Sequence, residues 1–271
     1  MSKLLRANFY RLCRSRALWL CTAGALVLSA AFALGVRADS AGGTALDEVF
    51  LQVFPFLPVA EAVFTALFLG VEYQDGTLRN KRIAGHSRGA IYAASMVTVT
   101  AGCFVLLLAW ALGGAVGIAR FGWFAAPAGQ LAAAAGVILL LTAANAAILT
   151  LIGMLTANRA VSAVVAILLT FALLMAGSSL YNALSEPEMS SAAVITANGV
   201  EVGEEQPNPY YVSGVLRDVF QFAVEALPSG QAILLANCEL SRPLLSAASS
   251  LGIVLLAGAA GIAMFRRKDL K

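Results

Sequence analysis

Few residues of this sequence have the types and spacing that catalysis or metal binding requires. The four cysteines, Cys13, Cys21, Cys103 and Cys238, stand singly without a CxxC pair, and His86 is the only histidine. A zinc site needs several Cys or His ligands at short spacings, and a disulfide framework needs several cysteines in an oxidising compartment, where only Cys238 is expected to lie. The pattern therefore predicts neither, and we expect this chain to bind no cofactor and no metal.

The sequence also lacks the phosphate-binding loop of many ATPases and the zinc-binding pair of many metalloproteases. No GxxxxGK[ST] loop and no HExxH pair occurs. We therefore do not expect an enzyme, and we expect no nucleic acid among the partners.

The densest group of polar side chains lies in "VEYQDGTLRNKRIAGHSRGAIY", residues 71–92, which holds two acids, four bases and the histidine. Asp75-Gly76 indicates a tight turn. Thr77 is then expected to cap a short helix over residues 78–83, and Gly85 to end it in the left-handed conformation. Ser87 is expected to cap the apolar segment that follows.

The short helix has a predicted apolar side and a predicted charged side. Leu78 and Ile83 are expected to anchor it, with Arg79, Lys81 and Arg82 exposed. An alternative is that these bases only hold the topology and contact anionic lipid headgroups. That alternative explains the charge but leaves the turn and cap residues without a role.

Glu61 is the one carboxylate inside a long apolar stretch, "FLPVAEAVFTALFLG". A carboxylate in the hydrocarbon region of a membrane is costly and usually faces a cavity or a partner. Glu61 is therefore a candidate pathway or subunit contact. Alternatively, Pro55 and Pro58 break the helix and place Glu61 near the outer interface.

The composition indicates the solvent that surrounds these residues. The chain is 60% hydrophobic and 12% charged over 271 residues, whereas soluble domains carry about 25% charged residues. This is too little polar surface for a water-soluble protein of this size. We therefore expect an all-α integral membrane protein that forms a single membrane-spanning domain over residues 1–271.

Six segments are long and apolar enough to cross a bilayer as helices, which takes about 20 residues each. A cleaved signal peptide is the alternative for the first segment, but its apolar run is longer than the usual 7–15 residues. The predicted spans are 17–36, 49–71, 90–118, 131–155, 160–181 and 246–265.

The basic residues are distributed unequally between the two sides of these spans. Of the 18 bases, fourteen fall before the first span, after the last, or in the second-to-third and fourth-to-fifth connections. Because such bases remain in the cytoplasm, both termini are predicted to be cytoplasmic.

The largest polar region, residues 182–245, is then on the outer side. Its first part reads as a solvated acidic loop with turns at Asn198-Gly199 and around Pro209. Its second part spaces Val215, Val219 and Phe222 as on one helix face, with a break at Pro228. We expect an amphipathic segment at the outer membrane surface or on the bundle; a small subdomain clear of the lipid is the alternative.

The segment after the second predicted span resembles the ABC-2 type permeases, the membrane subunits of a large class of bacterial ABC exporters. That family commonly shows Glu-Tyr, Gly-Thr-Leu-Arg-Asn-Lys, a Gly, Ser-Arg and Ile-Tyr in this order. The matching residues here are Glu72-Tyr73, Gly76-Thr77-Leu78-Arg79-Asn80-Lys81, Gly85, Ser87-Arg88 and Ile91-Tyr92.

The resemblance implies a fold, partners and a role for this loop. It implies six spans, with an amphipathic elbow helix near Leu4–Leu12 on the inner surface and two permease subunits, identical or related, around a pathway. ATP and Mg²⁺ would be bound by a separate ABC ATPase subunit. The loop residues that would couple to that ATPase are Glu72, Gly76, Thr77, Leu78, Arg79, Asn80, Lys81, Arg82, Gly85, Ser87 and Arg88.

The function expected from the resemblance is export of a substrate across the bacterial cell membrane. The alternative is a membrane scaffold or sensor subunit that is driven by the same ATPase contact and transports nothing. The apolar spans mildly favour a lipophilic drug, peptide or lipid as cargo.

Overall fold

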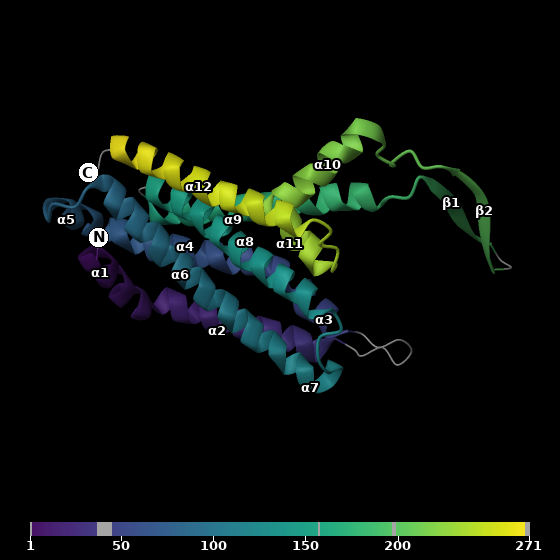
Figure 1. Ribbon diagram of the computed structural model, residues 1–271, viewed down its shortest axis with the longest axis horizontal. Helices are drawn as coiled ribbons and strands as arrows, with labels where there is room; N and C mark the ends of the chain where they lie inside the picture. Colours follow the sequence, from purple (N-terminus) through teal and green to yellow (C-terminus); the bar gives the residue numbers. More distant parts are fainter. Residues whose placement is uncertain (1, 37–44, 157, 197–198, 269–271) are drawn as a thin grey trace.

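The computed structural model describes residues 2–36, 45–156, 158–196 and 199–268 of the chain. Within these residues, six helices are long and apolar enough to cross a membrane, and they lie side by side in an elongated bundle (Figure 1). The first, fourth, fifth and sixth spans are single helices, and the third begins as one. These helices are α2 (Arg16–Gly35), α6 (Arg88–Gly114), α8 (Ala128–Leu155), α9 (Arg159–Ser185) and α12 (Pro243–Arg267).

The second span is composite. It runs from Leu46 to Gln74 as α3 (Leu46–Gln52), the 3₁₀ turn η1 (Phe54–Phe56) and α4 (Leu57–Gln74). Pro55 lies inside η1, and a proline there removes a backbone donor and interrupts the helix. The helix break of the alternative for Glu61 is therefore present, but the span continues through it, and a position of Glu61 near the outer interface stays a prediction.

Shorter elements complete the chain. At the start lies α1 (Ser2–Cys13), and between α4 and α6 lies α5 (Thr77–Ile83). After α6 come η2 (Ala115–Gly117) and α7 (Ile118–Phe121). Between α9 and α12 lie β1 (Met189–Thr196), β2 (Gly199–Pro207), α10 (Gly214–Ala226) and α11 (Pro228–Ala236).

Each predicted span coincides with one of the six helices, with boundaries that differ by a few residues. The largest difference is at the end of the fifth, which continues to Ser185 instead of 181. Polar side chains explain several starts: Ser15 accepts a hydrogen bond from Leu18 N at 3.4 Å, and Asn158 accepts one from Ala160 N at 2.9 Å. These N-caps satisfy amide groups that the first helical turn leaves free.

Close helix contacts in the bundle use small residues. Gly261 of α12 lies against the ring of Tyr92 on α6, which is fully buried and donates a hydrogen bond to Ala257 O at 3.4 Å. A second small-residue crossing packs Ala62 and Ala66 of α4 against Ala166 of α9. Small side chains allow helices in lipid to approach closely and gain dispersion contacts.

The predicted acidic loop is wrong for residues 189–196 and 199–207, which form the antiparallel strands β1 and β2 of a hairpin beyond the bundle (Figure 1). The sequence there holds Val194-Ile195-Thr196 and the alternating Val200 and Val202, and such β-branched residues favour strands. The predicted turn at Asn198-Gly199 lies partly outside the described residues.

The predicted amphipathic segment is confirmed as α10 and α11, which meet at 89° at Pro228. Val215, Val219 and Phe222 are exposed on α10, as expected for a helix that lies on a lipid surface. By contrast, α11 packs against α9 and α8, and Gln231 on it is fully buried. Whether this region lies at the membrane surface or forms a subdomain clear of the lipid stays a prediction.

The two ends of the bundle differ. Both chain termini and α5 lie at one end, which we call the α5 end, and the β-hairpin projects from the other, the hairpin end (Figure 1). The elements that carry most of the bases predicted on one side, namely α1, α5, the start of α6 and the end of α12, thus lie at the α5 end (Figure 1). Which side of a membrane each end faces stays a prediction.

Candidate functional site: a charged cluster at the α5 end

The predicted short helix exists as α5, and its start differs by one residue from the expectation. Gly76, with φ 63°, occupies the N-cap, and no side chain caps the helix. The helix begins at Thr77 itself, whose hydroxyl donates to Glu72 O at 3.1 Å, so the predicted capping role of Thr77 is wrong. Gly85 has φ 87°, as expected for the residue that reverses the chain.

Only one of the two predicted anchors of α5 is buried. Leu78 is 2% exposed, whereas Ile83 is 75% exposed. At 100° per residue, positions five apart lie about 140° apart around a helix, so both cannot face the bundle. Ile83 is instead the apolar residue of the outward surface of α5.

A buried carboxylate, Glu72, lies at the centre of the contacts that hold α5. Its side chain is fully buried at the end of α4 and pairs with Lys81 Nζ at 2.5 Å and with the guanidinium of Arg11 from α1. Lys81 Nζ also donates to Asn8 Oδ1 on α1 at 2.8 Å. One carboxylate therefore joins α1, α4 and α5.

Burial disfavours the charged forms of Lys81 and Arg11, and the negative charge of Glu72 offsets part of this cost. Burial lowers the pKa of both Lys81 and Arg11, and the charge of Glu72 acts in the opposite direction. The Arg11 guanidinium also lies over the ring of Phe68, 4.2 Å from its centroid, which is a favourable cation–π distance. The predicted exposure of Lys81 is thus wrong, because its side chain is only 15% exposed.

A second set of contacts at the same end joins α4, α8 and the end of α12. Lys268 Nζ donates to Tyr73 Oη at 2.7 Å and to Met154 O at 3.0 Å, and Tyr73 Oη also donates to Met154 O. Burial lowers the pKa of Lys268 to about 8. Arg88, at the start of α6, donates to Arg266 O at 2.6 Å.

The remaining residues of the predicted loop form an exposed surface or its frame. Arg79, Asn80, Arg82 and Ile83 are exposed on α5, and we call these four the outer face of α5. Ser87 accepts a hydrogen bond from Ala90 N at 3.2 Å and caps α6 as predicted. The outer face is therefore cationic with one apolar side chain, and it stands on a helix fixed at its base.

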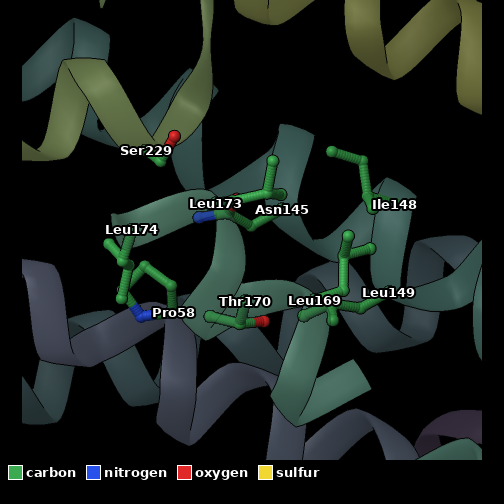
Figure 2. A pocket seen from close by; sticks show the side chains of 9 residues that line it. All are labelled: Pro58, Asn145, Ile148, Leu149, Leu169, Thr170, Leu173, Leu174 and Ser229. Carbon is green, nitrogen blue, oxygen red and sulfur yellow. The ribbon is translucent and has the colours of Figure 1, made fainter. Parts of the chain in front are cut away.

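Glu61 lies on α4 and is enclosed within the chain, 1% exposed, and no described residue forms a hydrogen bond with either of its carboxyl oxygens. Asn145 of α8 is the polar side chain that faces it. Asn145 also lines a small cavity of about 20 Å³ together with Thr170 and Ser229 (Figure 2), which is room for about one water molecule. A role of Glu61 in a pathway or a subunit contact stays a prediction.

Sequence reasoning did not identify Asn8, Arg11 and Lys268 as parts of this site. A usable signal was present: a carboxylate at the end of an apolar span, such as Glu72, requires a cationic partner. Which of the many nearby bases supplies it depends on how α1 packs. Among the described residues, no three His, Cys, Asp or Glu side chains lie together as a metal site would require.

These features define a multi-pass helical membrane protein with a buried ion-pair cluster at the α5 end of the bundle. The family model described as ABC-2 family transporter protein matches residues 4–177, more than half of the chain, and the chain belongs to this family. It is the membrane component, or permease, of an ABC transporter, and the family implies an ABC ATPase as its partner. No curated protein matches the chain.

The family match extends from α1 into α9. It therefore includes α5, Glu72 and its partners Asn8, Arg11 and Lys81. The hairpin, α10, α11 and α12 lie beyond the matched residues.

Proposed function

We propose that this permease is a subunit of an ATP-driven exporter in a bacterial plasma membrane, with both termini and α5 in the cytoplasm. The unequal distribution of bases supports this orientation, because fourteen of the 18 fall on the predicted inner side. The common location of α5 and both termini at one end of the bundle agrees with it (Figure 1).

The outer face of α5 is the proposed contact with the ATPase, and this proposal depends on one observation. A helix of seven residues exposes cations and Ile83 while a buried ion pair fixes its base to α4 and α1. Movement of α5 is therefore transmitted to α4 and, through Arg88 on α6 and Tyr73 on α4, to α12 and α8. A flexible loop with the same charges would not transmit such a movement.

In this proposal ATP and Mg²⁺ are bound and used by the partner, and the present chain supplies the passage. Two permease subunits, identical or related, enclose the pathway. Closure of the ATPases around ATP carries α5 with them and changes the tilt of the attached spans.

The proposed ATPase contact is tested by substitutions that change charge and size on the outer face of α5 and leave the ion pairs of Glu72 in place. We expect the double substitution Arg79→Glu and Ile83→Asp to weaken co-purification with the co-expressed ATPase by about tenfold or more, as for loss of an interface hot spot. Both side chains are exposed, so insertion and folding of the permease should not change.

Arg267→Glu is the matched control, because Arg267 is also exposed at this end but lies on α12. Equal binding of the ATPase by the double variant and the control would contradict the proposal. Transport assays in vesicles separate an exporter from the scaffold alternative, since a scaffold would show ATP turnover without movement of any cargo.

A further inference from the structure

A large cavity lies at the hairpin end, far from the Glu72 cluster. Its volume is about 780 Å³, and its walls come from α3, the start of α8, the end of α9, α10, α11 and the turn before α12. Gln130, Cys238 and Glu239 line it and are exposed, so it opens to the surface. Pockets that bind small organic molecules have volumes of about 300–1000 Å³.

Much of the cavity wall is apolar. Leucines from four elements line it: Leu51, Leu131, Leu184, Leu234 and Leu235. An organic molecule with an apolar body would gain free energy by displacing water from this wall.

The charged residues of the wall are mostly acidic. Asp47, Glu225 and Glu239 line the cavity, whereas Arg217 is the one lysine or arginine that does so among the described residues. Arg217 is already engaged, donating to Leu184 O at 2.9 Å and to Val212 O at 3.3 Å. The cavity therefore offers more negative than positive charge to a ligand.

Two of these carboxylates are oriented by the protein and keep unused acceptor capacity. Asp47 Oδ2 accepts from the amides of Ala125 and Ala126 at 3.0 and 2.9 Å, while its Oδ1 has no hydrogen-bond partner among the residues that the structure describes. Asp47 is 9% exposed. A buried anion whose oxygens are not fully paired is costly, and an incoming positive charge reduces that cost.

Glu225 shows the same arrangement on α10. It is 1% exposed, and its Oε1 accepts from Ser241 at 3.2 Å and from Gln221 Nε2 at 3.3 Å. Its Oε2 has no hydrogen-bond partner in the described part of the chain. Arg242 lies 3.6 Å from Oε2, but its side chain is 59% exposed, so solvent screens much of that charge.

We propose that this cavity binds an amphiphilic organic cation, with its apolar part against the leucines and its positive charge near Asp47, Glu225 and Glu239. The site requires no contact with an ATPase. The proposed cation site thus goes beyond the proposed function. A negative result for the cavity would not contradict the ATPase contact of α5, and the reverse also holds.

The cavity contains its own reporter, Cys238, which lines it and is exposed. Burial and then the nearby carboxylates Asp47 and Glu48 raise the pKa of its thiol, so labelling is done at mildly alkaline pH. The probes are tetraphenylphosphonium and tetraphenylborate, which share size and shape and differ in charge. The full chain in lipid nanodiscs is treated with a maleimide, and each cysteine is quantified by mass spectrometry.

We expect tetraphenylphosphonium to slow labelling of Cys238 by about tenfold at ten times its Kd, and tetraphenylborate at the same concentration to have little effect. Cys13, exposed at the α5 end, should be labelled at the same rate throughout and serves as the internal control. Equal protection by both ions, or protection by neither, would overturn the proposal.

A matched pair of variants tests the charge directly. Glu239→Gln removes an exposed carboxylate of the cavity, and Glu188→Gln removes an exposed one at the same end outside it. We expect Glu239→Gln to weaken protection by the phosphonium several-fold and Glu188→Gln to leave it unchanged. Identical protection in both variants would exclude the assigned role of the cavity carboxylates.

Discussion

At the scale of single residues, Glu72 has the most consequences. It is a fully buried carboxylate that pairs with two cations from different helices. A buried ion pair adds little net stability over apolar residues, but removing one partner leaves the others buried without a counter-charge. Glu72 therefore controls whether α1 and α5 stay attached to α4.

The first prediction concerns the loss of this charge. We expect Glu72→Gln to lower the free energy of unfolding by about 3 kcal/mol, because Lys81 and Arg11 lose their counter-charge. Thermal unfolding of the purified chain in detergent, followed by circular dichroism, should show the lower Tm. Arg82→Gln, on the exposed side of α5, is the control and should change stability by less than about 0.5 kcal/mol.

Adding Lys81→Met to Glu72→Gln should restore part of the loss, because one unpaired cation is removed. If Glu72→Gln proved as stable as the parent chain, Glu72 would not hold the cluster together.

At the scale of elements, the bundle depends on close crossings such as that of α6 and α12. A methyl group at position 261 would overlap the Tyr92 ring, which is fully buried. Tyr92 lies near the start of α6, which follows the loop that contains α5. Because α12 contacts Tyr92, a shift of α12 would also shift the start of α6. Packing at this crossing thus connects the α5 end to the middle of the bundle.

The second prediction compares two glycines of α12. Gly261→Ala should destabilise the chain by about 1–3 kcal/mol, because the buried ring must shift. A Cβ at Gly252 would meet no atom within 4 Å, so Gly252→Ala should be neutral or stabilising by up to about 1 kcal/mol from helix propensity. Thermal unfolding of the two variants under identical conditions measures the difference, and a similar Tm for both would contradict the packing argument.

The elements that sequence reasoning found are those with strong local signals. The six spans follow from length and apolar composition, and α5 follows from the turn and cap residues around it. Helix geometry alone shows that Leu78 and Ile83 cannot both be buried, but the packing of the bundle decides which of them is exposed. The hairpin is harder to predict, because its segment combines an acidic composition with β-branched residues, Val194-Ile195-Thr196 among them.

The site contacts were less accessible to sequence reasoning. Arg11 and Glu72 lie 61 positions apart by their numbers, and nothing local indicates which base on α1 meets the carboxylate. Likewise the 780 Å³ cavity is assembled from six separate parts of the chain, so no single motif indicates it.

At the scale of the whole molecule, the two ends of the bundle each contain an exposed cysteine: Cys13 at the α5 end and Cys238 at the hairpin end. The proposed orientation therefore predicts which thiol each side of the membrane can reach. We expect a membrane-impermeant maleimide to label Cys238 in intact cells and Cys13 only in inside-out vesicles.

The single variants Cys13→Ser and Cys238→Ser identify the labelled thiol in each preparation. Labelling of Cys13 in intact cells, with Cys238 protected, would reverse the proposed orientation and move α5 away from any cytoplasmic ATPase.

The common location of both termini and α5 has a consequence for gene architecture. A second polypeptide translated in continuity with either terminus begins beside α5, whichever side of the bilayer that is (Figure 1). If the ATPase docks on the outer face of α5 as proposed, a short linker from either terminus can join the two proteins in one polypeptide without a further membrane span. Such a fused chain would keep the two parts in permanent one-to-one stoichiometry.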